Sequence, residues 1–409
     1  MAVNLYDYKP IVGTAVIDEL RILARPFYKK TIKMVNSTRV GGGVAEILNR
    51  LIPLFNELEI DVKWEVIEGN EEFFDITKSF HNAIHGEKMN VTKGILDSFI
   101  ETNRQNAAKM SFNEDIIVIH DPQPIIMIEK KSNNNSKWIW RCHIDTSHSQ
   151  PEVWDFLKGY VEKYDASIFS SPNFSKSLSI PQFLVSPSID PLSEKNRDLP
   201  EDAVHSVVAK YKLDPKRPII TQISRFDRLK DPLGVIDAYR KVKKYTDCQL
   251  VLAGGAASDD PEANQVLAEI NEKVGNDKDI HVLNLPPFSD TDINALQRAS
   301  TIILQKSLRE GFGLTVTEGL WKGKPVIASN VGGIPSQIKH NLTGILVHSV
   351  DGCAYQIRYL LNNPDIAKRM GEYGKEYVRE KFLLTRSLRN YLLLFTVMNN
   401  PGKSLIELK

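Results

Sequence analysis

Short runs of β-branched and apolar residues alternate along this chain with longer amphipathic segments, and this alternation constrains the fold more than any other feature. Runs such as Asp115–His120 and Thr301–Leu304 are almost wholly apolar, which is typical of strands buried on both faces of a parallel sheet. The segments between them carry apolar residues at helical spacing. The pattern predicts a doubly wound α/β architecture. The expected strands are Thr31–Asn36, Val62–Ile67, Asp115–His120, Lys137–Ile144, Ala166–Phe169, Pro218–Ser224, Gln249–Ala253, His281–Leu283, Thr301–Leu304, Pro325–Ala328 and Gly344–Val347.

The length of 409 residues predicts more than one domain. Proline is frequent between Ser170 and Pro215, which indicates a linker rather than long helices. We expect two Rossmann-like domains, residues 1–190 and 191–385, followed by a helix in 386–409 for which packing against the first domain is one option. Two such sheets would offer the carboxyl ends of their strands to one deep inter-domain cleft, where ligands usually bind.

Composition excludes several classes of protein. Lys and Arg total 52 against 51 Asp and Glu, a net charge of +1, which argues against a globally basic nucleic-acid-binding surface and gives no attraction to membranes. The three cysteines, Cys142, Cys248 and Cys353, are too few and too scattered for a disulfide framework or a zinc site. The longest apolar stretch, Tyr391–Met398, is far below the roughly 20 residues needed to span a bilayer. We expect a cytoplasmic enzyme with no nucleic-acid or membrane partner.

The segment Ser307–Pro325 (SLREGFGLTVTEGLWKGKP) carries the strongest local signal. It follows an expected strand and turns through Gly311 and Gly313 before a helical stretch, so its N–H groups can approach a phosphate. Glu310 and Glu318 would flank this turn, and carboxylates there suit sugar and ribose hydroxyls. The alternative is a helix cap with a surface glutamate.

A second signal is the segment Ile219–Asp231 (IITQISRFDRLKD). Arg225 and Lys230 follow the end of a strand, where a guanidinium and an ammonium could neutralise a diphosphate without a metal. The alternative is a solvated loop in which Asp227 and Asp231 pair with these cations.

A third signal is the glycine turn in Arg39–Glu46 (RVGGGVAE), between a strand and a helix. Three consecutive glycines cost entropy unless something must approach the backbone, although the string is not a complete dinucleotide-binding fingerprint. A fourth is Trp138–Pro151, in which we expect His143 and Asp145 to end a strand. A base with its orienter, a metal pair, a sugar-hydroxyl site and a structural histidine all remain open, although a third metal ligand is missing despite nearby His148. Asp121 ends the preceding strand and could face the same crevice.

Neither a G-x-x-x-x-G-K-[ST] phosphate loop nor a G-x-S-x-G elbow occurs in the sequence, which disfavours phosphate-loop hydrolases and α/β-hydrolases. Taken together, the Glu310-x7-Glu318 pair, the SRFDRLKDP loop, the Val331–Pro335 turn and the first glycine turn resemble retaining glycosyltransferases of family 4, which have the GT-B fold. The strings RVGGGVAEIL, VIHDPQP, WRCHIDTS and SLREGFGLTVTE are similar to those of the trehalose glycosyltransferring synthases, known from heat-loving prokaryotes. Gly319 departs from the alanine expected there.

The resemblance implies roles for particular residues. Arg225 and Lys230 would hold the donor diphosphate, Glu318 would accept from ribose hydroxyls, and Glu310 would contact the transferred glucose. The implied catalytic residues are Arg225, Lys230, Glu310 and His143. Backbone groups would touch sugar and phosphate at Gly311, Phe312, Gly313, Leu314 and Thr315.

In the first domain, the resemblance implies that Gly42 and Gly43 approach the donor phosphates. His143, Asp145 and Asp121 would line the sugar or acceptor side. No metal is implied and no cofactor is required, with Mg²⁺ stimulation left open. The implied partners are nucleoside-diphosphate glucose, glucose and trehalose, and base rates favour a homodimer.

The implied activity is a reversible, retaining transfer from ADP-, UDP- or GDP-glucose to free glucose that forms α,α-trehalose. Glu310 as a nucleophile remains an alternative to a front-face route in which the leaving phosphate oxygen takes the acceptor proton. The alternative functions are a retaining trehalose phosphorylase, a family 4 enzyme with another acceptor, and a sugar-binding protein without turnover. The incomplete glycine fingerprints disfavour a dinucleotide oxidoreductase.

Overall fold

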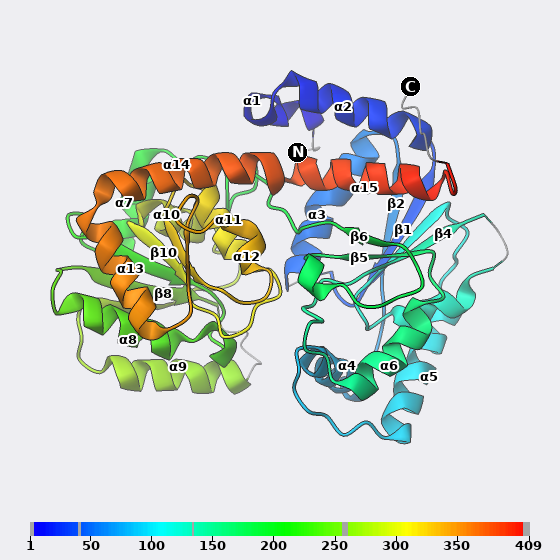
Figure 1. Cartoon of the computed structure of the whole chain (residues 1–409), viewed down its shortest axis with the longest axis horizontal. Coiled ribbons are helices and arrows are strands. Elements are labelled where there is room, and N and C mark those ends of the chain that lie inside the picture. Colours follow the sequence, from blue (N-terminus) through cyan, green and yellow to red (C-terminus); the bar gives the residue numbers. More distant parts are fainter. Residues whose placement is uncertain (1–3, 40–41, 133–134, 256–260, 404–409) are drawn as a thin grey trace. The chain divides into compact units, whose positions relative to one another are not determined.

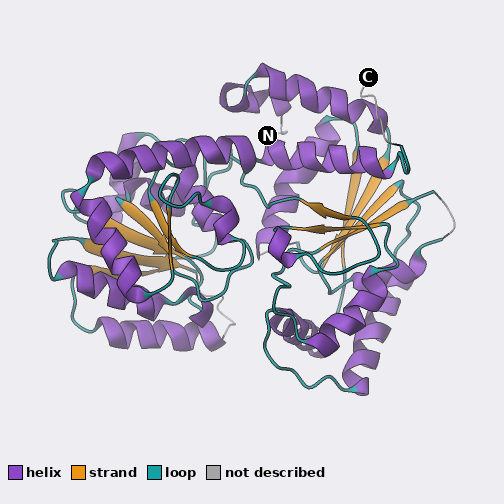
Figure 2. Ribbon diagram, in the orientation of Figure 1, coloured by secondary structure: helices purple, strands orange, loops and turns teal. Residues whose placement is uncertain are grey.

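The structure is a computed structural model that describes residues 4–39, 42–132, 135–255 and 261–403 (Figure 1). The chain divides into two compact units, residues 1–188 with 384–409 and residues 189–383, and each unit is an α/β domain with helices around a central sheet (Figure 2). None of the described helices is both long and apolar enough to cross a membrane.

The first unit is built on a six-stranded parallel sheet with the order β2-β1-β3-β4-β5-β6. The strands β3 and β5 are fully buried, as their apolar runs predict. The strands are β1 (Thr31–Asn36), β2 (Asp61–Val66), β3 (Ile116–His120), β4 (Lys137–Arg141), β5 (Ala166–Phe169) and β6 (Gln182–Leu184).

Helices cover this sheet, and the last helix of the chain belongs to the same unit. The ring of Phe395 in α15 packs at centroid distances of 6.0 Å and 6.1 Å from Phe27 and Phe55. The helix α4 begins where Asn70 accepts a hydrogen bond from the N–H of Phe73, 2.9 Å away. The helices are η1 (Leu5–Tyr8), α1 (Lys9–Val12), α2 (Thr14–Ala24), η2 (Arg25–Phe27), α3 (Gly42–Glu57), α4 (Glu71–Ile84), α5 (Lys93–Lys109), η3 (Ile125–Lys130), α6 (Pro151–Val161), η4 (Pro172–Phe174) and α15 (Leu384–Met398).

The second unit has a six-stranded parallel sheet of its own, in the order β12-β11-β10-β7-β8-β9. Counted within the unit, this is the 3-2-1-4-5-6 order of dinucleotide-binding Rossmann domains read from the other edge. The strands are β7 (Ile219–Ile223), β8 (Gln249–Gly254), β9 (Ile280–Asn284), β10 (Ile302–Gln305), β11 (Val326–Ser329) and β12 (Ile345–Val347).

The helices of the second unit connect these strands. Asp231 caps α8: its carboxylate accepts from the N–H of Gly234 at 3.0 Å, and Pro232 occupies the first helical position. The helices are α7 (Glu201–Lys210), η5 (Arg228–Lys230), α8 (Pro232–Lys243), α9 (Pro261–Val274), α10 (Asp290–Ala299), α11 (Leu314–Trp321), α12 (Ile334–Gln337), α13 (Val350–Asn362) and α14 (Pro364–Lys381).

The expected strands are all confirmed within a few residues, and the structure makes two additions. The proline-rich stretch holds the short edge strand β6 and the helix α7, which lies between Pro200 and Pro215. The strand β4 ends at Arg141, so the expectation that His143 and Asp145 end a strand is wrong: both lie on the following loop.

The strand order reverses once in each sheet, and open α/β sheets bind ligands at the carboxyl ends of the strands on either side of such a reversal. In the first unit the reversal lies between β1 and β3, and in the second between β7 and β10. Most of the candidate residues lie in the loops that follow these four strands or in the helices that those loops lead into.

Candidate active site

In the second unit, the loops after β7 and β10 bring Lys230 and Glu310 together. Lys230 ends η5, and Glu310 precedes α11. The Nζ of Lys230 donates to Oε2 of Glu310 at 2.7 Å, and both side chains are largely buried. The structure thus joins two candidates that lie 80 residues apart in sequence.

Two further donors hold the Glu310 carboxylate. Oε2 also accepts from Nε2 of Gln305, 3.2 Å away, and from Oγ of Ser307, 3.1 Å away. Gln305 in turn donates to the hydroxyl of Ser307 at 3.0 Å. Three donors on one oxygen fix the orientation of the carboxylate and satisfy that oxygen, as a buried charge requires.

The glycine turn between Glu310 and α11 is tight. Gly313 has φ = +83°, a conformation that favours glycine, and a Cβ there would lie 3.1 Å from Cγ of Glu310. None of the described side chains caps the N-terminus of α11, which leaves its first N–H groups available to an anion. The neighbouring positions are fixed by the Gly333 N–H, which donates to the Gly311 carbonyl at 3.1 Å.

The remaining candidates of this turn belong to the helix that follows. Leu314 begins α11. The hydroxyl of Thr315 donates to the carbonyl of Ile223, 3.2 Å away, which ties the first turn of α11 to the end of β7. Phe312 is buried, and its carbonyl accepts from Nε2 of Gln337. The main chain from Gly311 to Thr315, which we expect to contact sugar and phosphate, is therefore held by Ile223 of β7 and by Gln337 of α12.

Arg225 does not join the Lys230–Glu310 pair. Its side chain is 76% exposed, and Nη2 lies 3.2 Å from the carboxylate of Asp227. The second loop carboxylate, Asp231, pairs with Lys306. Arg225 therefore pairs with a carboxylate of its own loop, as the alternative interpretation of this segment predicts, whereas Lys230 does not.

Glu318 is buried and has its own partners. Nε2 of Gln297 in α10 donates to one carboxylate oxygen at 3.0 Å, and the Nζ of Lys195 lies 3.8 Å from the other. Burial lowers the pKa of Lys322, one turn along the chain, to about 7. Its ammonium donates to the side chain of Asn196 at 3.0 Å. The two glutamates of the Glu-x7-Glu pair therefore sit in separate hydrogen-bond networks.

In the first unit, the ends of β3 and β4 gather Asp121 and His143. Asp121 has φ = +64°, and its carboxylate accepts from the N–H of His143 at 2.7 Å. Burial raises the pKa of Asp121 to about 7, against the opposing effects of that hydrogen bond and of Arg141. Burial likewise lowers the pKa of His143 well below its ordinary value, so its imidazole is neutral. The ring of His143 contacts His120, the last residue of β3, with an N···N distance of 3.0 Å.

Asp145 lies on the same loop, two residues after His143. Its carboxylate accepts from the N–H of Ser147 at 2.9 Å and from the hydroxyl of the same residue. The hydroxyl also contacts Nδ1 of His148, 2.9 Å away. Asp145 thus shapes the loop that carries His143, while its side chain stays partly exposed.

The first glycine turn is described only in part. The helix α3 begins at Gly42 and includes Gly43, while Val40 and Gly41 lie outside the described residues. The turn follows β1, on the other side of the strand-order reversal from Asp121. The guanidinium of Arg39 lies 5.1 Å from the ring centre of Trp64, on the neighbouring strand β2.

Sequence reasoning missed several residues of these networks, and most of them share one signal. Each is a polar residue at the carboxyl end of an apolar run or directly after it. They are His120, Arg141, Gln305 and Ser307. Gln297 and Lys195 carry no such signal, because each reaches Glu318 only through tertiary packing.

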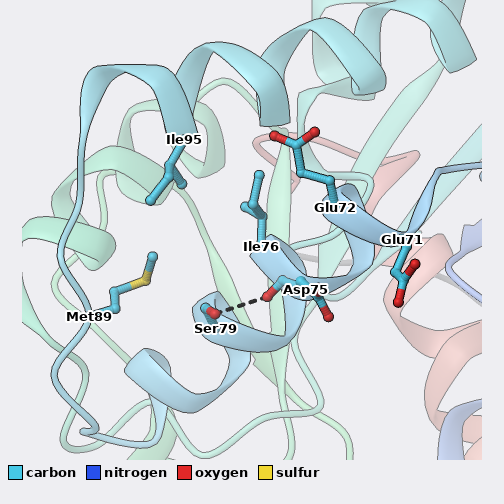
Figure 3. Close-up of a pocket in the computed structure, with 7 residues that line it drawn as sticks. All are labelled: Glu71, Glu72, Asp75, Ile76, Ser79, Met89 and Ile95. Atoms are coloured by element: carbon cyan, nitrogen blue, oxygen red, sulfur yellow. Dashed lines mark hydrogen bonds between the residues drawn. The ribbon is translucent and has the colours of Figure 1, made fainter.

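A hollow of about 450 Å³ in the first unit contains none of the candidate residues (Figure 3). Acidic and polar side chains of α4 line it together with three apolar ones: Ile76 in α4, Met89 in the segment before α5, and Ile95 in the first turn of α5. None of the residues that line it has a buried polar atom without a partner. The strand-order reversals are therefore the better guide to the site.

Two doubly wound parallel domains of this kind form the GT-B fold of glycosyltransferases. The solved structure of the trehalose-6-phosphate synthase OtsA has a TM-score of 0.72 at 14% identity and covers 91% of this chain and 99% of its own. Sucrose-phosphate synthase from Thermosynechococcus elongatus has a TM-score of 0.69 at 16% identity, with 90% and 98% covered.

Sequence comparison gives the family. The model described as "Trehalose synthase, N-terminal domain" matches residues 34–176, and "Glycosyl transferases group 1" matches residues 206–377. A trehalose synthase of Thermococcus litoralis is 45% identical over 95% of this chain and 96% of its own, and that of Rubrobacter xylanophilus is 41% identical over 96% of each. A trehalose phosphorylase of Pleurotus pulmonarius is 30% identical over 98% of this chain and 62% of its own. The chain belongs to the trehalose synthase family of glycosyltransferases.

Proposed function

We propose that this chain is a retaining glucosyltransferase that forms α,α-trehalose from a nucleoside-diphosphate glucose and free glucose, in a reversible reaction. The observation that carries the proposal is the Lys230–Glu310 pair beside the uncapped N-terminus of α11. It combines a cation and main-chain donors for a phosphate with a carboxylate for sugar hydroxyls. The names of the relatives support trehalose as the product.

In this proposal, Lys230 and Arg225 stabilise the negative charge that develops on the leaving diphosphate. Arg225 is exposed, and among the described residues it pairs with Asp227 alone, so it is free to turn toward an incoming anion. Lys230 is already fixed by Glu310, so its ammonium needs little reorganisation. These two cations take the role that a metal has in other phosphate-transfer sites, and activity is expected to persist in EDTA.

Glu310 orients the transferred glucose through hydroxyls rather than attacking its anomeric carbon. Oε2 is already engaged by three donors, which lowers its availability as a nucleophile. We propose a front-face route in which the leaving phosphate oxygen takes the proton of the acceptor hydroxyl. The protein then contributes positioning and charge stabilisation.

Glu318 is the proposed ligand of the ribose hydroxyls, and His143, Asp145 and Asp121 form the proposed acceptor side in the first unit. A trehalose phosphorylase is the second candidate, favoured by the relative from Pleurotus pulmonarius that aligns with 98% of this chain. Incubation with trehalose and either a nucleoside diphosphate or inorganic phosphate separates the two. If glucose 1-phosphate forms from trehalose and inorganic phosphate, and no reaction occurs with a nucleoside diphosphate, the protein is a phosphorylase and not a synthase.

A further inference from the structure

Two histidines of the first unit share one hydrogen bond. His120 ends β3 and is fully buried, whereas His143 lies on the loop after β4 and is partly exposed. Nδ1 of His120 lies 3.0 Å from Nε2 of His143, and the rings are inclined by 18° with centroids 5.3 Å apart. The main-chain N–H of His143 donates to the carboxylate of Asp121, which holds the backbone of His143 beside the end of β3.

Both imidazoles are neutral, so one proton must lie between them. Burial lowers the pKa of His120 to about 3, and the positive charge of Arg141 opposes protonation of either ring. In a neutral pair one nitrogen donates and the other accepts. Either His120 donates from Nδ1 to His143, or His143 donates from Nε2 to His120.

The outer nitrogen of His120 distinguishes the two arrangements. Nε2 of His120 is buried and has no hydrogen-bond partner among the described residues. If His120 donates from Nδ1, this outer nitrogen carries only a lone pair. If His143 donates, the outer nitrogen carries a buried N–H with no acceptor, and orphaned N–H groups are the rarer and costlier defect.

Arg141 favours the same arrangement. The parallel pairing of β3 with β4 places His120 and Arg141 opposite each other, so their side chains leave the sheet on the same face. Nε and Nη1 of Arg141 are buried donors without partners in the described part of the chain, while Nη2 donates to Ser170 and Val185. A lone pair on His120 is attracted to this guanidinium, whereas an N–H would be repelled.

We infer that His120 donates from Nδ1 to Nε2 of His143 and thereby fixes His143 as a neutral ring that carries its proton on Nδ1. Nδ1 of His143 has no protein partner among the described residues, and the residue is partly exposed, so Nδ1 can donate to a sugar hydroxyl oxygen. The basic nitrogen of His143 is occupied, which excludes it as a general base. His120 is a positioning residue. The sugar as recipient rests on the proposed function, whereas the tautomer does not.

The tautomer is read directly by long-range ¹H–¹⁵N NMR on protein labelled in its nine histidines. The signals of the pair are assigned from their loss in His120→Asn and His143→Asn. We expect both rings to carry the proton on Nδ1, with Nε2 unprotonated, at neutral pH. A proton on Nε2 of His143, or an imidazolium signal from either ring, would overturn the inference.

Two substitutions of similar size test the consequence for catalysis. His120→Asn keeps an N–H at the position of Nδ1, whereas His120→Leu removes it. We expect His120→Leu to lower kcat/KM for the acceptor glucose about tenfold, chiefly through KM, and to leave the KM of the nucleotide sugar unchanged. His120→Asn should keep most of the wild-type kcat/KM for glucose. Equal losses in both variants, with equal thermal stability, would contradict the positioning role.

The tautomer of His143 and the proposed function are overturned by different results. If no sugar donor reacts with the wild-type protein, the proposed function is wrong, yet the NMR spectrum still decides the tautomer. If trehalose forms but His143 carries its proton on Nε2, the proposed function stands and the inference is wrong.

Discussion

The Nζ of Lys230 lies 2.7 Å from Oε2 of Glu310, across the two loops that follow the adjacent strands β7 and β10. These strands flank the strand-order reversal of the second unit. The pair therefore occupies the position where open α/β sheets bind their ligands. It places a charge for phosphate next to an acceptor for hydroxyls, and the first predictions concern these two residues.

Lys230→Ala is expected to lower kcat by 10²–10³-fold, roughly the effect of removing one charge-stabilising donor from a transition state. Arg228→Ala is the matched control on the same loop, because Arg228 pairs with Glu269 instead, at 2.6 Å. That variant should stay within about threefold of the wild-type rate. Steady-state kinetics check both, and comparable rates in the two variants would remove Lys230 from the site.

Glu310→Gln tests whether the carboxylate orients the sugar or attacks it. The amide keeps the shape but lacks the charge that pairs with Lys230, so we expect kcat to fall by about 10². Intact-mass spectra of the wild-type protein with a slow fluorinated donor should show no glucosyl adduct. An adduct that disappears in Glu310→Gln would establish Glu310 as the nucleophile.

Gly313→Ala separates backbone strain from crowding of the site. Gly313 and Gly323 both have positive φ, +83° and +70°, so alanine at either should cost about 1–2 kcal/mol in the free energy of unfolding. Only the Cβ at position 313 would crowd Glu310, while nothing lies within 4 Å of one at Gly323. We expect equal losses of stability in urea, with an additional tenfold or greater loss of kcat/KM in Gly313→Ala alone. Equal activity in both would show that the turn tolerates the change.

Asp121 predicts a pH dependence of stability. Burial raises its pKa from 3.8 to about 7, so the folded chain holds a proton that the unfolded chain releases. Its contribution to the free energy of unfolding is complete below pH 4 and is lost as the pH rises through 7. Asp121→Asn keeps an acceptor for the His143 N–H but does not titrate. The free energy of unfolding of the variant, relative to that of the wild type, should therefore rise by on the order of 3 kcal/mol from pH 4 to pH 8.

Urea unfolding at several pH values checks this, with the wild type and Asp121→Asn measured side by side. A difference that stays flat with pH, or that falls as the pH rises, would show that Asp121 is ionised in the folded chain.

The sequence was sufficient for the architecture because parallel strands buried on both faces have unbroken apolar runs. The same runs predicted that Lys230 and Glu310 each follow a strand. Their pairing could not be predicted, because it depends on β7 and β10 being neighbours in the sheet. The buried position of Glu318 could not be predicted either, because its partner Gln297 is brought to it by the packing of α10.

Two local expectations show where spacing fails. Arg225 and Lys230 are five residues apart on one loop, yet the first stays exposed beside Asp227 and the second turns inward to Glu310. His120 was missed because it reads as the end of an apolar run, although a polar residue in that place faces the ligand edge of the sheet.

The proposed activity is tested most directly by NMR analysis of the products after incubation of the purified protein with ADP-glucose and free glucose, with UDP-glucose and GDP-glucose in parallel. With at least one donor, we expect a disaccharide with one anomeric proton signal in the α range and an equal amount of released nucleoside diphosphate. Absence of any disaccharide from all three donors, or a product with β configuration, would contradict it.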